Sequence, residues 1–229
     1  MECSYLWRIF RRRILLIAAL FIGSTALSFG QGGAAKAVLP VTVLVESPAE
    51  TKTDLQVICL FASSPANTLH GSLIEMNDKL HGLLERIRKP GLFGGELGET
   101  ILLTPPPGTL AANRLLVIGL GDSATFTAER MYLVGKIALR EANRLGVRHP
   151  FFAPTVLDGG VDKFATGEIS EQVVRGMRDA LATEAVLHAG SAAAPVGVVD
   201  FVFLAGAKHA KDTQDGIARG FGASSSAVH

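Results

Sequence analysis

Residues 93–121 read FGGELGETILLTPPPGTLAANRLLVIGLG and hold the pattern that decides the fold. Within this stretch an apolar run, Leu115 to Ile118, opens directly onto the turn Gly119-Leu120-Gly121. A β-strand that ends in glycines is one way in which α/β proteins hold phosphate at a sheet edge. Three consecutive prolines, Pro105 to Pro107, cannot lie inside a central strand, so they predict a loop between this strand and an earlier one at 100–103.

Outward from this stretch, short apolar runs alternate with amphipathic segments. We expect strands at 41–45, 55–62, 100–103, 114–118, 151–156 and 198–204, and helices at 67–89, 127–145, 170–188 and 208–219. Such alternation predicts one three-layer α/β/α domain over 38–222, with a mixed, mostly parallel sheet. We expect antiparallel pairing within the first two strands and within the pair around the proline loop. The small polar tail, 223–229, is expected to be disordered.

The N-terminus has the composition of an export signal. Four arginines lie between Arg8 and Arg13, and the segment from Ile14 to Phe29 carries no charge. A basic start followed by a short apolar run predicts a signal peptide over 1–37, cut somewhere within 28–37, and a periplasmic or extracellular protein. The alternative is an uncleaved membrane anchor at 14–29, although this run is shorter than the ~20 residues that span a bilayer.

Charge and cysteine content exclude some classes of function. Of the chain's 22 basic and 21 acidic residues, 1–37 hold five and one, so the remainder carries a formal charge of −3. A mildly acidic body does not favour nucleic-acid binding, which depends on neutralising phosphates. Once 1–37 are removed, Cys59 is the single cysteine and lies inside an apolar run, which predicts a buried, unreactive thiol.

Three motifs in a fixed order resemble a known family. Phe93-x-Gly95 and Gly98-Glu99-Thr100 precede one apolar strand, and Arg114-Leu-Leu-Val-Ile-Gly-Leu-Gly121 forms the next. This order resembles the N-terminal domain of the leucyl aminopeptidase (cytosol aminopeptidase) family, over roughly residues 41–190. The resemblance implies a macro-like fold. In that family a larger C-terminal domain supplies the two-zinc site through lysine, aspartate and glutamate, and we recognise no counterpart of that site here.

Motifs for chemistry within the chain are weak. The sequence holds no HExxH, CxxC or GxSxG pattern. His70 and His81 would lie about 16 Å apart along the expected helix, too far to share an ion. Asp158 and Asp162 flank Gly159-Gly160, where turn formation is favoured over a weak cation site. We therefore expect no catalytic residues, no metal and no cofactor.

The glycine turn is a weak candidate for a ligand site. A dinucleotide fingerprint places its third glycine at position 124, which is Ala124, and Asp122 adds a negative charge where a pyrophosphate would lie. The next helix is expected only near Thr127. A structural turn is therefore favoured. Loops that follow parallel strands remain the candidate rim of a ligand cleft, and the residues in question are Gly119, Gly121, Asp122, Ser123, Asp158, Gly159 and Gly160.

These observations favour an exported, non-catalytic protein that acts in protein–protein interaction or regulation, with self-association as one form. One alternative is a small-molecule binding module, because macro domains bind ADP-ribose and a nucleotide-like ligand follows from that resemblance. Another is the detached half of a split metallo-aminopeptidase. A membrane contact is expected only if the signal peptide is not cleaved.

Overall fold

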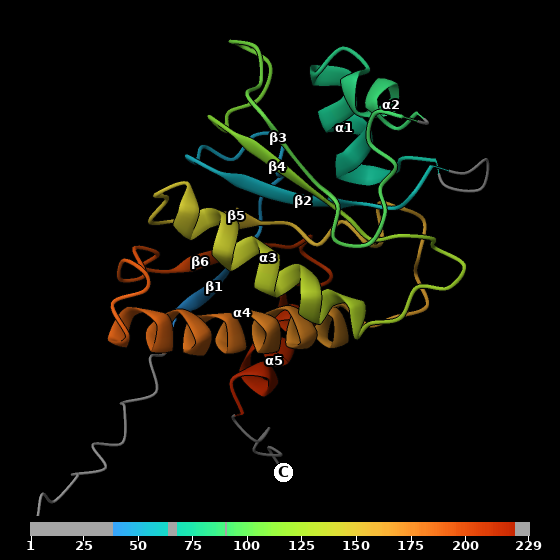
Figure 1. The fold of residues 1–229 in the computed structure, drawn as a ribbon. Helices are drawn as coiled ribbons and strands as arrows, with labels where there is room; N and C mark the ends of the chain where they lie inside the picture. The colour runs from blue at the N-terminus through green and yellow to red at the C-terminus, as the bar shows by residue number, and fades with distance from the viewer. Residues whose placement is uncertain (1–38, 64–67, 90, 223–229) are drawn as a thin grey trace, which may run out of the picture. The chain divides into compact units, whose positions relative to one another are not determined.

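The computed structural model describes residues 39–63, 68–89 and 91–222 (Figure 1). Its elements, in chain order, are β1 (Val41–Leu44), β2 (Gln56–Leu60), α1 (Gly71–Lys79), α2 (Leu83–Ile87), β3 (Thr100–Leu103), β4 (Leu115–Gly119), α3 (Arg130–Arg144), β5 (Phe151–Phe152), α4 (Thr166–Ala189), β6 (Phe201–Leu204) and α5 (Ala210–Gly220). The predicted signal peptide, anchor and disordered tail lie outside the described residues. Among these described residues, none of the helices combines the length and the hydropathy of a membrane-spanning segment.

The six strands form one sheet in the order β1-β6-β5-β2-β4-β3. Every neighbouring pair is parallel except β3 and β4, which are antiparallel on either side of the proline loop. The mixed, mostly parallel α/β fold is thus confirmed. The expected pairing of the first two strands is wrong, because β1 pairs with β6 at the edge of the sheet. Its side chains are alternately half-buried and exposed, whereas every residue of β2 is buried, as expected for a central strand.

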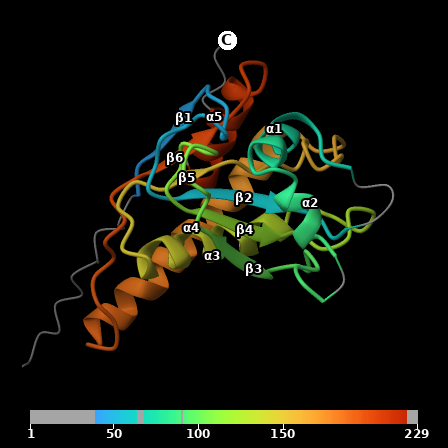
Figure 2. The same cartoon turned by 90° about the horizontal axis from the view of Figure 1, so that it is seen from above.

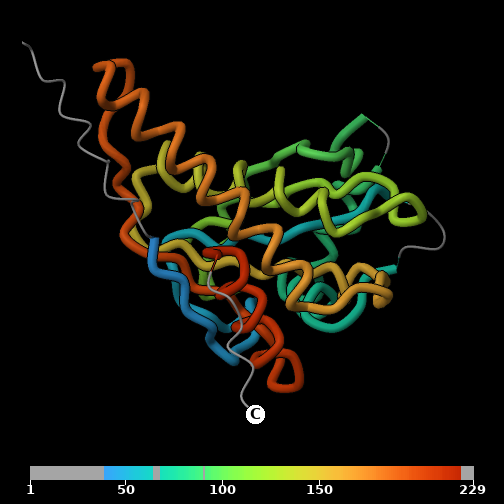
Figure 3. The backbone as a smooth tube through the Cα atoms, turned by 90° about the horizontal axis from the view of Figure 1, so that it is seen from below, coloured from blue at the N-terminus to red at the C-terminus, as the bar shows by residue number. Residues whose placement is uncertain are grey.

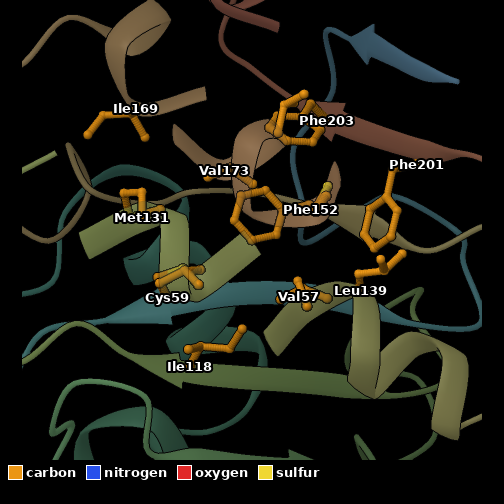
Figure 4. Packing of buried hydrophobic residues seen from close by; sticks show 14 of the residues in the cluster. Val57, Cys59, Ile118, Met131, Leu139, Phe152, Ile169, Val173, Phe201 and Phe203 are labelled. Atoms are coloured by element: carbon orange, nitrogen blue, oxygen red, sulfur yellow. The ribbon is translucent and has the colours of Figure 1, made fainter. Parts of the chain in front are cut away.

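The central strands bury side chains on both faces, and this produces two cores. On β2, Val57 and Cys59 face the helices α3 and α4, while Ile58 and Leu60 face α1 and α2. Because successive strand residues point to opposite faces, an unbroken apolar run is what a doubly covered strand requires. Figure 4 shows the larger core, in which Phe152 and Phe203 from neighbouring strands lie 5.1 Å apart between ring centroids.

The helices on the α3 and α4 side approach one another through glycines. A Cβ atom on Gly135 of α3 would lie 2.0 Å from the backbone oxygen of Val173 in α4, and one on Gly176 would lie 1.9 Å from that of Tyr132. Gly216 of α5 meets the backbone oxygen of Gly167 in the same way, at 1.9 Å. Seen from above in Figure 2 and from below in Figure 3, α5 lies beside α4 and next to β1.

The prediction of a single helix over 67–89 is wrong. The helix α1 ends at Lys79, and His81 and Gly82 adopt positive φ angles of 54° and 74° before α2 begins. A left-handed pair of residues ends a helix because it turns the backbone out of the helical path. His70 is the N-cap of α1 and His81 lies in the break, so the spacing estimated for a continuous helix does not apply.

Several other boundaries differ from the sequence prediction, most of all the end of β5 and the start of α4. The strand expected at 151–156 is only two residues long, because Pro154 lacks an N–H and Thr155 turns to a φ of 51°. The helix expected from Ser170 begins at Thr166. Ser170 is therefore not its cap: the buried hydroxyl donates to the backbone oxygens of Thr166 and Thr213 and joins α4 to α5.

Candidate functional site

A cavity of about 580 Å³ lies at the carboxyl ends of the adjacent parallel strands β1, β6 and β5. The carboxyl edge of a parallel sheet is where α/β proteins form ligand clefts, because the loops diverge there while the strands stay rigid. Its walls come from the loops after these strands and from the beginnings of three helices. The lining residues are 45–48, 153–158 and 204–206, with Ser72 and Glu75 of α1, Phe164, Thr166 and Ile169 near the start of α4, and His209 and Thr213 at α5.

The end of β5 opens one side of the cavity. Thr155 is buried at positive φ, which is rare for a β-branched residue. Its hydroxyl donates to the backbone oxygen of Cys59 at 2.7 Å and accepts from the backbone amide of Cys59 at 2.9 Å. This side chain replaces the backbone pairing that a longer strand would give to β2. The segment 153–158 can therefore leave the sheet and form a wall of the cavity.

A second wall is polar and acidic. Ser47, after β1, donates its hydroxyl to Oε2 of Glu75 in α1 at 2.6 Å. Ser72, one turn earlier in α1, donates to Oδ2 of Asp158. The backbone oxygen of Asp158 also accepts from the amide of His70 at 2.8 Å, so this loop is fixed to the start of α1. The two serines thereby orient two carboxylates beside the same cavity.

The remaining walls are largely apolar. Val156, Ile169 and Leu204 are buried residues that reach the cavity from the loop after β5, from α4 and from β6. Phe164 is half-buried and packs edge-on against Phe126, with 5.5 Å between ring centroids. A concave space with a few oriented polar groups on an apolar surface is typical of small-molecule sites.

The start of α4, at the cavity, is capped by a residue from another helix. Ala165 occupies the N-cap position and has no side chain that can accept a hydrogen bond. Asp212 of α5 takes this role: its Oδ2 accepts from the backbone amide of Gly167 at 2.6 Å and from the hydroxyl of Thr166 at 2.9 Å. The bond from Gly167 is the main cause that holds the pKa of Asp212 below its ordinary value.

The predicted glycine turn lies elsewhere, at the end of β4, and does not line the cavity. The amide of Gly121 donates to the backbone oxygen of Gly95 at 2.8 Å, and Gly98 donates to Gly119 at 3.0 Å. A Cβ on Gly119 would lie 2.1 Å from the backbone oxygen of Glu96. The segment 95–98 therefore covers this turn, and the two halves of the 93–121 stretch need glycine because their backbones touch.

Of the other predicted site residues, some lie in the turn after β4 and some in or near the loop that lines the cavity. Asp122 accepts from the amide of Ala124 at 2.9 Å, and Ser123, which has a partner of its own, follows it in the turn after β4. Asp158 lines the cavity, whereas Gly159 packs on the ring of Phe61 without lining it. Gly160 has a φ of 87° and is exposed. A ligand role for the residues away from the cavity stays a prediction.

Sequence reasoning missed the residues that contact the cavity from α1, α5 and the β1 loop. Ser47, Ser72 and Glu75 line the cavity, and Asp212 caps the helix that begins there. None of the four belongs to a motif, and the sequence does not show their contacts. The one available signal was the alanine at the start of α4, which leaves that helix without a side-chain cap and predicts an acceptor from elsewhere.

The described part of the chain holds one cysteine and no cluster of metal-ligating side chains. No group of three or more His, Cys, Asp or Glu residues there is arranged to hold a metal ion. Cys59 is fully buried in β2, and burial raises the pKa of its thiol far above the ordinary range. The expectation of a buried thiol is confirmed.

Comparison with known proteins identifies the matching family and fold. The family model described as cytosol aminopeptidase family, N-terminal domain, matches residues 57–186. Proteins named "Probable cytosol aminopeptidase" from Burkholderia mallei and Burkholderia pseudomallei are each 33% identical over 89 residues. This match covers 39% of the chain and 17% of those proteins, so the chain corresponds to only a small part of their length.

Solved structures share the fold at low sequence identity. A tomato leucine aminopeptidase variant has a TM-score of 0.55 at 17% identity, covering 81% of this chain and 36% of that one. A Trypanosoma brucei macrodomain in complex with ADP-ribose has a TM-score of 0.56 at 15% identity, covering 80% and 71%. The macro domain of ganglioside induced differentiation associated protein 2 has a TM-score of 0.56 at 12% identity, covering 81% and 86%.

Proposed function

This chain belongs to the cytosol aminopeptidase family, through the N-terminal domain of that family, and we propose that it is an exported, non-catalytic domain that binds a small molecule. The cavity at the carboxyl ends of β1, β6 and β5 is the observation that carries this proposal. Its volume of about 580 Å³ falls within the roughly 300–1,000 Å³ of small-molecule sites. Two carboxylates fixed by serines lie beside apolar walls, as in sites that orient a ligand.

The non-catalytic part of the proposal is supported by where the family match lies. The matching model is that of the N-terminal domain, over residues 57–186. The relatives named as aminopeptidases are matched over 17% of their length. An assay of the purified protein on leucine amide, with added zinc or manganese, is expected to show no turnover. Metal-dependent turnover by the purified chain would contradict this part of the proposal, and dependence on a separately encoded chain would support the split-enzyme alternative.

Export is supported by the arginine-rich start and the uncharged segment that follows it. Expression of the full chain in a bacterium with a periplasm, followed by fractionation and N-terminal sequencing, tests this part. We expect the protein in the periplasm with a new N-terminus between residues 28 and 38. An intact chain that stays with the membrane fraction would support the anchor alternative.

Ligand binding in the cavity can be tested without knowing the natural ligand. A fragment library with equal numbers of neutral, cationic and anionic members is screened by ligand-observed NMR. We expect some fragments to bind the wild type. The same fragments should not bind the Ala205→Phe variant, in which the new ring fills the cavity from the loop after β6. Ala207→Phe is the matched control, because Ala207 is exposed in the same loop and does not line the cavity. If no fragment binds, or if the two variants behave alike, the proposal is wrong.

The expectation of a protein partner stays a prediction. Near the end of α4, Val186 is 71% exposed and Leu187 39% exposed. Exposed apolar residues gather at some protein interfaces, yet single ones are also common on monomers. Nothing in the structure indicates what would cover these two side chains, so the cavity supports ligand binding better than this surface supports a partner.

A further inference from the structure

We propose that the cavity selects a cationic ligand with an apolar body, such as a protonated amine joined to a hydrocarbon or aromatic group, over an anionic nucleotide. This inference rests on the proposed function, because it names the ligand class of the same cavity. Three properties support this inference: the charge of the lining residues, the capped start of α4, and the apolar composition of the other walls.

The charged residues that line the cavity are mostly of one sign. Glu46, Glu75 and Asp158 contribute carboxylates, and no lysine or arginine is among the described residues of the lining. The other ionisable side chain among the described lining residues is the imidazole of His209. Binding a diphosphate without a cationic side chain would place like charges together in a partly desolvated space, where their repulsion is stronger than in water.

Each of the two oriented carboxylates has a second oxygen to which its serine does not donate, and that of Asp158 lies beside the backbone of Gly71. Ser47 donates to Oε2 of Glu75, and Ser72 donates to Oδ2 of Asp158. Among the described residues, none donates a hydrogen bond to Oε1 of Glu75 or to Oδ1 of Asp158. Lys79, one turn after Glu75, is hydrogen-bonded to Glu50 at 2.6 Å and also interacts with the charge of Glu75 without a hydrogen bond to it. An ammonium group has three donors and can therefore bridge such acceptors.

Of the three helices that begin at the cavity, α4 has its place for an anion already filled. The backbone amides in the first turn of a helix attract phosphate or carboxylate groups. At α4 this position is taken by Asp212, whose carboxylate binds the amide of Gly167 at 2.6 Å and the hydroxyl of Thr166 at 2.9 Å. A ligand phosphate at this helix start would have to displace this internal carboxylate. A cationic ligand leaves the cap in place.

The apolar walls suit the body of such a ligand. The apolar side chains that line the cavity include Phe164, Val156, Ile169 and Leu204. Lys163 lies over the ring of Phe164, 5.1 Å from its centroid, and is not among the lining residues. Burial of hydrocarbon against these walls would add affinity that does not depend on charge. Neutral molecules of the same shape should therefore bind too, more weakly than the amine.

Three molecules of matched shape test the inference: 4-phenylbutylamine, 4-phenylbutanol and 4-phenylbutyrate. Their affinities for the full mature protein are measured by isothermal titration calorimetry at neutral pH. We expect the amine to bind about tenfold more tightly than the alcohol and the butyrate more weakly than both, because two charge-assisted hydrogen bonds are gained or lost. Tighter binding of the butyrate, or of ADP-ribose, than of the amine would overturn the inference while leaving small-molecule binding intact. Failure of every probe and of the fragment library would contradict the proposed function itself.

Charge variants locate the effect in the cavity. Glu75→Gln with Asp158→Asn removes both oriented charges and keeps acceptors for the two serines. The matched control is Asp78→Asn with Asp162→Asn, which removes the same charge from exposed residues of the same helix and loop. We expect the first pair to lose the preference for the amine and the control pair to keep it. Equal behaviour of the two pairs would overturn the inference.

A single charge reversal gives an independent check that does not disturb the serine contacts. Glu46 lines the cavity, is exposed, and has no hydrogen-bond or ion-pair partner among the described residues. Glu46→Lys should therefore fold normally, and its melting temperature is measured to verify this. We expect it to weaken binding of 4-phenylbutylamine and strengthen binding of 4-phenylbutyrate. Unchanged preferences in a folded variant would count against the inference.

Discussion

Asp212 on α5 accepts a 2.6 Å hydrogen bond from the backbone amide of Gly167 in the first turn of α4. The residues are far apart in sequence, yet the contact completes a helix whose own N-cap residue, Ala165, has no acceptor. It joins two helices, fixes one end of the cavity wall and occupies the position where an anion would otherwise bind. Stability and ligand preference therefore depend on the same carboxylate.

Replacing Asp212 by alanine should destabilise the protein by about 1–2 kcal/mol at neutral pH, as expected for loss of a helix cap. Because its folded pKa is lowered, the carboxylate stabilises the protein above the unfolded pKa, about 3.9, and this is lost as pH falls through the folded value. Urea unfolding of wild type and variant should therefore differ at pH 7, and the difference should shrink as the pH falls below the unfolded pKa. Asp215→Ala removes an exposed carboxylate from the same helix and serves as the control.

Gly119→Ala should destabilise the protein by about 3 kcal/mol, since its new Cβ would lie 2.1 Å from the backbone oxygen of Glu96. Backbone atoms cannot move aside as a flexible side chain can. Gly197→Ala is the matched control, because the nearest atom to its Cβ would be 3.9 Å away. Chemical denaturation measures both. A Gly119→Ala variant as stable as the control would show that the segment 95–98 does not pack closely on the turn.

Gly176→Ala should also destabilise the protein, by about 2–3 kcal/mol, although alanine is the better helix former by about 1 kcal/mol. The added Cβ would meet the backbone oxygen of Tyr132 at 1.9 Å and separate α4 from α3. The sign of the change in unfolding free energy decides between the two effects. A stabilised variant would mean that helix propensity dominates and that the helices are not held this closely.

Thr155→Val should destabilise the protein by about 2–3 kcal/mol, because it leaves both the buried amide and the buried oxygen of Cys59 without the threonine hydroxyl. Valine is also β-branched, so the strain of the positive φ is unchanged. Thr183→Val is the control: its exposed hydroxyl bonds to a backbone oxygen within α4. Equal unfolding free energies for the two variants would contradict the role given to Thr155.

Cys59 should resist alkylation in the folded protein, since its thiol is fully buried and its pKa is raised by burial. Treatment with iodoacetamide, followed by peptide mapping, measures this directly. We expect the peptide that contains Cys59 to stay unmodified in buffer and to be modified in strong denaturant. Rapid modification under native conditions would mean that the carboxyl end of β2 opens readily.

Much of the fold follows from local patterns in the sequence. The unbroken apolar runs of β2 and β4 predict central strands covered on both faces, and the prolines at 105–107 predict the turn between β3 and β4. The break between α1 and α2 was missed, because the apolar spacing continues through it while His81 and Gly82 turn left-handed. The start of α4 was misplaced, because Ser170 is typical of a cap and yet lies inside the helix.

The candidate site was predicted less well, for a reason that lies in the kind of contact involved. Asp158 was expected at the rim of a ligand cleft, and it does line the cavity. The turn at Gly119 and Gly121 was expected at the same rim, but residues 95–98 cover it. Glycines that allow a ligand to approach and glycines that allow another piece of backbone to approach leave the same letters in a sequence. Only the tertiary structure distinguishes them.

The sequence by itself determined the class of fold, the two-sided core and the family to which the domain belongs, because these depend on hydrophobic periodicity and on short motifs. The tertiary structure decided where a ligand could bind and which charge it would meet. The cavity exists because β1, β6 and β5 end side by side, which brings Ser47, Asp158 and Thr213 from distant parts of the chain to one space. No local pattern records that meeting, since it is fixed by the order of strands in the sheet.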